Sequence, residues 1–315
     1  MAEQQEGIIV KGIGGFYTVE AADAVYTCRA RGIFRKNGQT PLAGDHVRIQ
    51  VLDAGEGALE EILPRKNHLV RPPVANLDVL VLVASIADPA PNTLIMDKMI
   101  ARAEDLGIEP VLVINKIDLE DAAWLEEAYR LAGIPVFVLS ALDAVSTQPL
   151  QAYLSGKVSA FTGNSGVGKT SLLNAIDPRL GLETGEGNTI GLVCHSDLTG
   201  ETSKKLGRGR HTTRTAVLYK QPGGGYIVDT PGFSSLDMEK AALIPREQLP
   251  YCFREFAPYL LECRFASSCA HVREKGCAVR QAVEEGKIAR SRYDSYVAMM
   301  EEVKDQKSWM QNPKK

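Results

Sequence analysis

Hydrophobic and polar positions follow different patterns in successive parts of the chain. Up to about residue 71 they alternate in short runs; in residues 46–53, for example, Val47, Ile49 and Val51 fall on one side. Such alternation predicts strands with one buried face. Turn signals rich in glycine, asparagine and proline separate these runs, so we expect a small barrel of the OB type.

From residue 74 onwards the apolar positions form continuous runs rich in valine and isoleucine. These runs cover residues 77–86, 109–118, 134–141 and 158–165, and helix-like stretches between them cover residues 92–107, 120–133 and 149–156. Runs that can be buried on both faces, alternating with helices, predict an α/β domain with a parallel sheet and right-handed crossovers. Residues 215–230 predict a hairpin that turns at its glycines.

After about residue 236 apolar residues recur at helical spacing among many charges. The sequence therefore predicts three units: an OB-type barrel over residues 1–72, an α/β domain over 73–236 and a helical domain over 237–315, with residues 71–73 as the first linker.

Composition narrows the class of protein. The 315 residues are 44% hydrophobic, enough for buried cores, and the net charge of −3 shows no global affinity for nucleic acid. The longest apolar runs have strand length, and the first ten residues lack a secretory pattern, so we expect a cytoplasmic protein without a membrane partner. Three of the six cysteines crowd together with a histidine, which in a cytosolic protein suggests metal more than disulfides.

A phosphate-binding loop follows the last apolar run. "GNSGVGKT" matches G-x-x-x-x-G-K-[ST] between a strand and a helix, which is the context that the motif requires. Backbone N–H groups and the helix N-terminus would hold phosphates, Lys169 would reach the β- and γ-phosphates, and the Thr170 hydroxyl would hold Mg²⁺. The predicted nucleotide contacts here are Gly163, Asn164, Ser165, Gly166, Val167, Gly168, Lys169, Thr170 and Ser171.

Two further motifs predict a guanine base. In "NKID" the Asp118 carboxylate would accept two hydrogen bonds from guanine, which adenine cannot donate, while Asn115 ties the base to the loop and the Lys116 stem covers it. In "SAL", residues Ser140, Ala141 and Leu142, the Ala141 N–H would donate to guanine O6.

The remaining nucleotide motifs lie farther along the chain. "DTPG" offers Asp229 for Mg²⁺ and the Gly232 N–H for the γ-phosphate, and Thr212 or Thr213 of "GRGRHTTR" would complete the Mg²⁺ shell. An ordinary small GTPase begins with the phosphate loop and reaches N-K-x-D and S-A last. Here N-K-I-D and S-A-L come first, so the same parts are circularly permuted.

This order, with the barrel before it and "GRHTT", "DTPGF" and a Cys/His cluster after it, resembles the ribosome small subunit-dependent GTPase A family, also called RsgA or YjeQ. The resemblance covers essentially the whole chain. It implies a GTP-hydrolysing, GTP- and GDP-binding, Mg²⁺-dependent factor in late maturation of the small ribosomal subunit, with that subunit and its rRNA as partners. We expect a monomer.

The Cys/His cluster consists of Cys263, Cys269, His271 and Cys277. Three thiolates and one imidazole can close a tetrahedral zinc site of the structural kind, which leaves no open position for catalysis. The alternative is three buried cysteines beside a core histidine. In the family that the chain resembles, one residue fewer separates the first two cysteines than separates Cys263 from Cys269 here.

The predicted fold class is thus multidomain α/β: an N-terminal OB-type β-barrel, a circularly permuted P-loop GTPase domain and a C-terminal helical zinc-binding domain.

One basic stretch of the barrel suggests contact with RNA. Arg29, Arg31, Arg35 and Lys36 surround Phe34, which suits backbone contacts and base stacking, although a solvated charged face is equally compatible.

The sequence differs from that of ordinary GTPases at Phe233, because small GTPases commonly have at this position a glutamine that orients the attacking water. His211 is the nearest replacement, in a loop that Arg208 and Arg210 would dock on the subunit. One alternative is a GTP-regulated RNA-binding module without catalysis. A second alternative is an ATP-using enzyme, which Asp118 disfavours.

Overall fold

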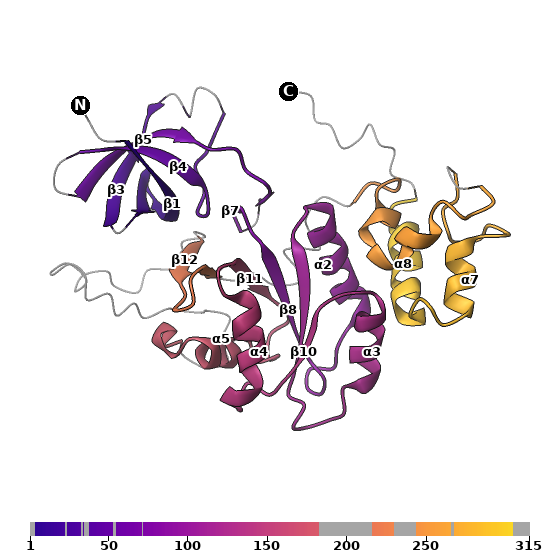
Figure 1. The fold of residues 1–315 in the computed structure, drawn as a ribbon. Helices are drawn as coiled ribbons and strands as arrows, with labels where there is room; N and C mark the ends of the chain where they lie inside the picture. Colours follow the sequence, from indigo (N-terminus) through magenta and orange to yellow (C-terminus); the bar gives the residue numbers. More distant parts are fainter. Residues whose placement is uncertain are drawn as a thin grey trace.

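The computed structural model describes residues 4–304 except 23, 33, 35–37, 53–54, 71, 183–215, 230–243 and 266–267. Figure 1 shows the barrel, the α/β domain and the helical C-terminal domain in sequence order. In the described part of the chain, each helix is too short or too polar to cross a membrane.

The N-terminal unit is a closed five-stranded barrel. Its strands are β1 (Gln4–Ile13), β2 (Phe16–Ala21), β3 (Ala24–Ala30), β4 (His46–Val51) and β5 (Glu56–Ile62). They pair in the order β1-β2-β3-β5-β4, and β4 returns to β1, which is the OB arrangement that the alternating pattern predicted. Ile9, Val47 and Ile49 are fully buried inside it because alternate residues of a strand share one face.

The second unit is an α/β domain with a six-stranded sheet. Its strands are β8 (Val79–Ser85), β9 (Glu109–Asn115), β10 (Val136–Val138), β11 (Val158–Thr162), β12 (Val217–Lys220) and β13 (Tyr226–Asp229). The order is β10-β9-β8-β11-β13-β12, parallel except for β12, which forms the predicted hairpin with β13.

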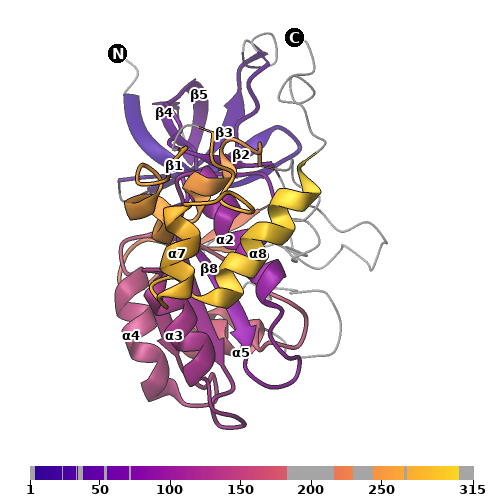
Figure 2. The same cartoon turned by 90° about the vertical axis from the view of Figure 1, so that its right-hand side faces the viewer.

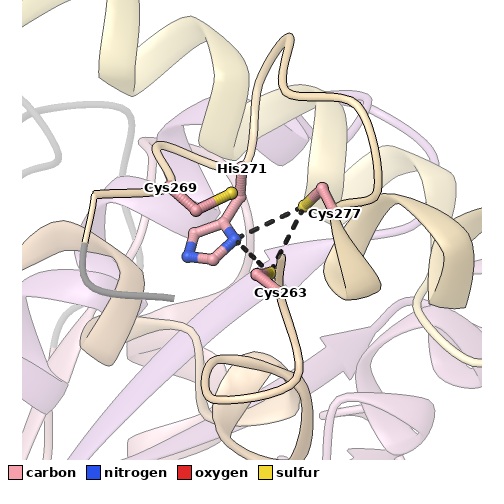
Figure 3. A group of neighbouring side chains, drawn as sticks. All are labelled: Cys263, Cys269, His271 and Cys277. Atoms are coloured by element: carbon pink, nitrogen blue, oxygen red, sulfur yellow. Dashed lines mark hydrogen bonds between the residues drawn. The ribbon is translucent and has the colours of Figure 1, made fainter. Parts of the chain in front are cut away.

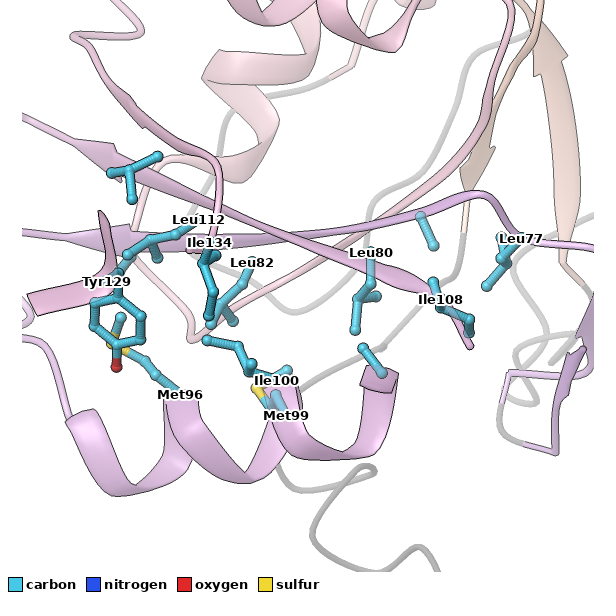
Figure 4. Close-up of a cluster of buried hydrophobic side chains, with 14 of the residues drawn as sticks. Leu77, Leu80, Leu82, Met96, Met99, Ile100, Ile108, Leu112, Tyr129 and Ile134 are labelled. Carbon is cyan, nitrogen blue, oxygen red and sulfur yellow. The ribbon is translucent and has the colours of Figure 1, made fainter. Parts of the chain in front are cut away.

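Helices cover both faces of this sheet. They are α2 (Thr93–Asp105), α3 (Ala123–Leu131), α4 (Ala144–Leu154), α5 (Lys169–Ile176) and the 3-10 turn η2 (Pro178–Leu180). On one face Met96 and Met99 of α2 pack with Leu80 and Leu82 of β8 (Figure 4). On the other face α4 and α5 cover the intervening valines of β8, so this strand is buried throughout.

Helix α4 begins earlier than the sequence predicts. The apolar spacing suggested a start at Pro149, but the helix begins at Ala144, where the Asp143 carboxylate accepts from the Val145 N–H at 3.0 Å. The proline lies inside the helix at its second turn.

A short hairpin and a strand pairing connect the barrel to the α/β domain. Of residues 71–73, expected to be a linker, Pro72 and Pro73 lie in the turn of a short hairpin between β6 (His68–Leu69) and β7 (Val74–Ala75), and residue 71 lies outside the described residues. Nearby, the buried Asp45 carboxylate holds the Arg65 guanidinium at 2.6 and 2.8 Å. Strand β1 also pairs with β12, so both units share one continuous sheet.

The C-terminal unit packs against α2. It contains the 3-10 helices η3 (Leu249–Cys252) and η4 (Arg254–Tyr259) and the helices α7 (Ala278–Glu284) and α8 (Arg290–Glu302). The helical stretch after residue 277 is thus two helices, separated at Gly286, whose φ of 72° favours glycine. Figures 1 and 2 show α8 lying beside α2.

Candidate nucleotide and metal sites

The predicted nucleotide motifs gather at one edge of the α/β sheet. Asn115 ends β9, Ser140 follows β10, Gly163 follows β11 and Asp229 ends β13. These strands are parallel, so their carboxyl ends meet at the same edge, where ligands of open α/β sheets bind.

Asn115 joins three of these loops. Its side chain is buried; the Nδ2 group donates to the Val167 carbonyl at 2.9 Å, and Oδ1 accepts from the Ala141 N–H at 2.8 Å. A Cβ atom at Gly168 would lie 2.3 Å from Asn115 Nδ2, so this approach requires glycine. One buried amide therefore fixes the predicted base motifs against the predicted phosphate loop.

The phosphate loop has the geometry that the motif requires. Gly163 has a φ of 147°, and a Cβ there would lie 2.2 Å from the Val83 carbonyl. Lys169 opens α5, and its ammonium donates to the carbonyls of Gly163 and Asn164, both at 2.7 Å. Burial lowers the pKa of Lys169 to about 8. Phosphate favours the charged form, so phosphate affinity should fall as the pH rises through this value.

The other predicted nucleotide contacts lie around this core. Thr170 and Ser171 are half-buried in the first turn of α5, and Asp118 is exposed beyond β9. Ser140 Oγ accepts from the Leu142 N–H at 3.4 Å, which orders the S-A-L turn.

Lys116 has a contact that the sequence did not predict. Its ammonium donates to the carbonyl of Asp88, in the segment between β8 and α2. Ser85 Oγ also donates to this carbonyl, at 3.5 Å. The sequence contained one hint, because this segment leaves the same edge of the sheet as the nucleotide motifs.

Several predicted residues cannot be placed. The side chain of Asp229, and all of His211, Thr212, Thr213, Gly232, Phe233, Arg208 and Arg210, lie outside the described residues.

The four predicted zinc ligands converge in the C-terminal unit (Figure 3). The ligand atoms of Cys263, Cys269, His271 and Cys277 all lie within 4.8 Å of one another. The Sγ atoms of Cys263 and Cys277 are 3.8 Å apart, and His271 Nδ1 lies 3.4 and 3.5 Å from them. Tetrahedral zinc with Zn–S bonds of about 2.3 Å separates two sulfur ligands by about 3.8 Å. The site therefore fits zinc, and Cys263 belongs to it despite its longer spacing.

Other groups shape this metal loop. The Glu274 carboxylate accepts from the backbone N–H groups of Ala270, Val272 and Arg273 at 2.9–3.0 Å. From α8, the Tyr296 hydroxyl donates to the Ala270 carbonyl at 2.8 Å. Burial lowers the pKa of His271, which favours the neutral, metal-binding imidazole. Sequence spacing gave no signal for Glu274 or Tyr296.

The barrel surface differs from the expectation. Phe34 is 5% exposed and belongs to the barrel core, so the prediction that it stacks on bases is wrong. Arg31 pairs with Glu60 at 2.6 Å, and Arg35 and Lys36 lie outside the described residues. In the described part of the barrel, Phe16 is an exposed aromatic beside a cation, and its ring centre lies 4.8 Å from the Arg29 guanidinium carbon.

The permuted motif order on this fold defines a circularly permuted P-loop GTPase with an OB-type barrel before it and a Cys₃His domain after it. The chain belongs to the RsgA GTPase family, whose profile matches residues 62–239. The profile of the RsgA N-terminal domain matches residues 6–59. The family predicted from the motif order is thus confirmed.

Relatives resemble the chain over almost its whole length. A protein of Caldanaerobacter subterraneus named small ribosomal subunit biogenesis GTPase RsgA is 45% identical, covering 96% of this chain and 97% of the relative. A Bacillus subtilis protein of the same name is 42% identical, covering 96% and 98%. Two solved structures, YjeQ from Thermotoga maritima and YloQ, described as a circularly permuted GTPase, both have a TM-score of 0.78. Their sequences are 36% and 37% identical to this chain, respectively. Each match covers 97% of this chain, and it covers 100% of the YjeQ chain and 96% of the YloQ chain.

Proposed function

We propose that this protein hydrolyses GTP as a late maturation factor of the small ribosomal subunit, with turnover stimulated by that subunit. The observation that carries the proposal is Asn115, whose buried amide joins the phosphate loop to both base motifs in the permuted order. The names of the relatives supply the biological process. We further propose that the factor works as a monomer in the cytoplasm and contacts rRNA.

The nucleotide would be held by the residues predicted from the motifs. The backbone of the phosphate loop and Lys169 would bind the phosphates, and Asp118 would accept from the guanine base. Thr170, Asp229 and Thr212 or Thr213 would hold Mg²⁺, which supplies charge neutralisation at the γ-phosphate when it is bound. The three domains would correspond to residues 1–72, 73–236 and 237–315.

The principal test is release of phosphate from GTP over many turnovers, with and without purified small subunits. Turnover that rises with subunit concentration supports the proposal. Nucleotide binding without multiple turnovers under either condition would instead identify a GTP-regulated RNA-binding module.

Guanine selectivity can be tested at Asp118. We expect Asp118→Asn to weaken GDP binding by about 100-fold or more and to favour xanthine nucleotides, because a base-specific hydrogen bond in such a site gives strong discrimination. Competition against a fluorescent GDP analogue measures both effects.

A matched control for that experiment is Asp121→Asn, which changes a nearby exposed carboxylate outside the motif. It should leave GDP affinity unchanged. If ATP displaces the analogue from the wild-type protein as well as GDP does, the base assignment is wrong.

The exposed pair on the barrel gives a test of RNA contact. We expect the double variant Phe16→Ala, Arg29→Glu to weaken binding to small subunits by about tenfold, because it removes both a stacking platform and a phosphate contact. The salt dependence of binding should also become shallower, since fewer counterions are released.

Cosedimentation with subunits across a salt series measures this change, and GTP affinity should stay constant. Arg130→Glu on α3 is the control, because the contacts of this exposed side chain among the described residues are with Glu126 at 2.7 Å and with the Val136 carbonyl at 3.1 Å, both on the α/β domain. Unchanged cosedimentation of the double variant would exclude this face from the interface.

A further inference from the structure

Helix α2 packs against the α/β sheet with one face and against the C-terminal unit with another. Its Met96, Met99 and Ile100 side chains point to the sheet (Figure 4). Ala101, on another face, belongs to the buried core of the C-terminal unit, and Asp97 lies one turn before it. The helix therefore lies between the sheet of the nucleotide domain and the C-terminal domain that carries the metal loop (Figure 2).

The segment that leads into α2 belongs to the surroundings of the nucleotide motifs. The Ile86 N–H donates to the Asn115 carbonyl at 3.1 Å, and Lys116 donates to the Asp88 carbonyl. A Cβ atom at Gly166 would lie 3.5 Å from Pro89 Cδ. Residues 86–92 thus contact a base motif and the phosphate loop, and any movement of α2 along its axis would disturb both.

At the other face, a buried ion cluster fixes α2 to the C-terminal unit. Arg292 of α8 is 1% exposed, and its guanidinium donates to Asp97 at 2.6 Å and to Glu255 of η4 at 2.8 and 3.1 Å. The Tyr129 hydroxyl of α3 also donates to Asp97, at 2.8 Å. A buried charge of this kind requires its partners, so the cluster specifies one relative position of α2 and α8.

The same helix α8 holds the metal loop. Two tyrosines follow Arg292 in this helix, one and four residues later. The Tyr293 hydroxyl donates to the His271 carbonyl at 2.9 Å, and the Tyr296 hydroxyl donates to the Ala270 carbonyl at 2.8 Å. Contacts therefore run without interruption from the metal loop through α8 and α2 to the phosphate loop.

We propose that Arg292 is a positioning residue for the nucleotide site. By fixing Asp97 it holds α2, and with it residues 86–92, against Lys116 and the phosphate loop. The inference rests on the guanine-nucleotide binding proposed above, and it places one determinant of that binding in the C-terminal unit. Coupling between two sites is reciprocal, so bound nucleotide also stabilises the contact between α2 and α8.

The decisive variant is Asp97→Asn in the full-length protein. It removes the ionic link to α2 but leaves Arg292 paired with Glu255, so no buried charge loses its only partner. Burial raises the pKa of Asp97, so the neutral form of this side chain is easier to reach here than in water. We expect the variant to fold and to release a fluorescent GDP analogue about three- to tenfold faster than the wild type.

Two further variants separate positioning from general stability. Lys98→Ala breaks the partly exposed pair with Glu302, at 2.8 Å in the same interface, and should leave GDP release within twofold of the wild type. Arg292→Lys keeps the charge but not the forked geometry, so its release rate should lie between those of the wild type and Asp97→Asn. A purely structural role would lower the melting temperature without changing GDP release at 25 °C.

Hydrogen exchange of α8 amides, with and without GDP, completes the test. Protection that increases with GDP in the wild type and not in Asp97→Asn supports the proposal. GDP release within twofold of the wild type in both Asp97→Asn and Arg292→Lys overturns it, and if Asp97→Asn does not fold, Arg292→Lys decides alone. Failure of the wild-type protein to bind GDP would instead refute the proposed function.

Discussion

Replacing Cys277 with serine is expected to remove zinc from the protein and to unfold the C-terminal unit. Cys263 and Cys277 are buried within the apolar core of that unit, so the metal would close its centre. Structural zinc contributes about 10–16 kcal/mol of apparent binding free energy in small zinc domains, and this energy is coupled to folding. We expect about one zinc per chain in the wild type and much less in the variant. Elemental analysis of tag-free protein measures both values.

Cys252→Ala is the matched control for that prediction. Cys252 is also a buried cysteine of this core, and burial raises its pKa to about 12, but its thiol does not belong to the four-ligand cluster. This variant should keep its zinc, whereas Cys263→Ser should lose it. Wild-type protein that contains no zinc would show that the cluster is a set of buried cysteines beside a core histidine.

The zinc content should also depend on pH. Burial raises the pKa of the Cys269 thiol to about 12 when no cation is near it, so zinc must displace protons in order to bind. Zinc affinity therefore falls as the pH is lowered. A chelator titration at several pH values should show the direction of this effect, with earlier loss of zinc at acidic pH.

The nucleotide loops could be predicted from the sequence because their chemistry is encoded locally. Gly163 and Gly168 are required because a Cβ atom there would lie 2.2 Å from the Val83 carbonyl oxygen and 2.3 Å from the Asn115 side chain, and such requirements leave a fixed spacing in the sequence. The strands of the parallel sheet were equally visible, since β8 is buried over its whole length and reads as a continuous apolar run.

The remaining features depend on tertiary contacts that spacing cannot reveal. Phe34 stands among basic residues in the sequence, yet the barrel buries it, and Phe16 from another strand lies beside Arg29 instead. Arg292 is one of many charges in the C-terminal helical stretch, yet it is buried and paired with Asp97, which lies 195 residues away in the sequence. No local pattern contains that information.

Small subunits are expected to raise GTP turnover by about tenfold or more, and His211→Ala should lose most of this stimulation. The reason lies in the motif after the hairpin. Phe233 occupies the position where GTPases commonly place a water-orienting glutamine, and a phenyl ring can neither accept nor donate the required hydrogen bonds. The phosphate loop and Lys169 would still position and neutralise the γ-phosphate, so a slow intrinsic rate should remain.

We propose that His211 supplies the missing group when the protein binds the subunit, with Arg208 and Arg210 contacting rRNA. A neutral imidazole can accept a proton from the attacking water, so the stimulated rate should fall as the pH drops below about 6.5, the ordinary pKa of histidine. Intrinsic turnover should lack this dependence.

The control is His195→Ala, which removes the other histidine of residues 183–215 and should keep full stimulation. His211→Ala should retain GTP affinity and cosedimentation with subunits, because the imidazole would act only on the attacking water. Phosphate release measured under multiple turnover, at saturating subunit concentration, separates the two variants. If His211→Ala is stimulated as strongly as the wild type, the histidine is excluded, and the catalytic group must come from the ribosome itself.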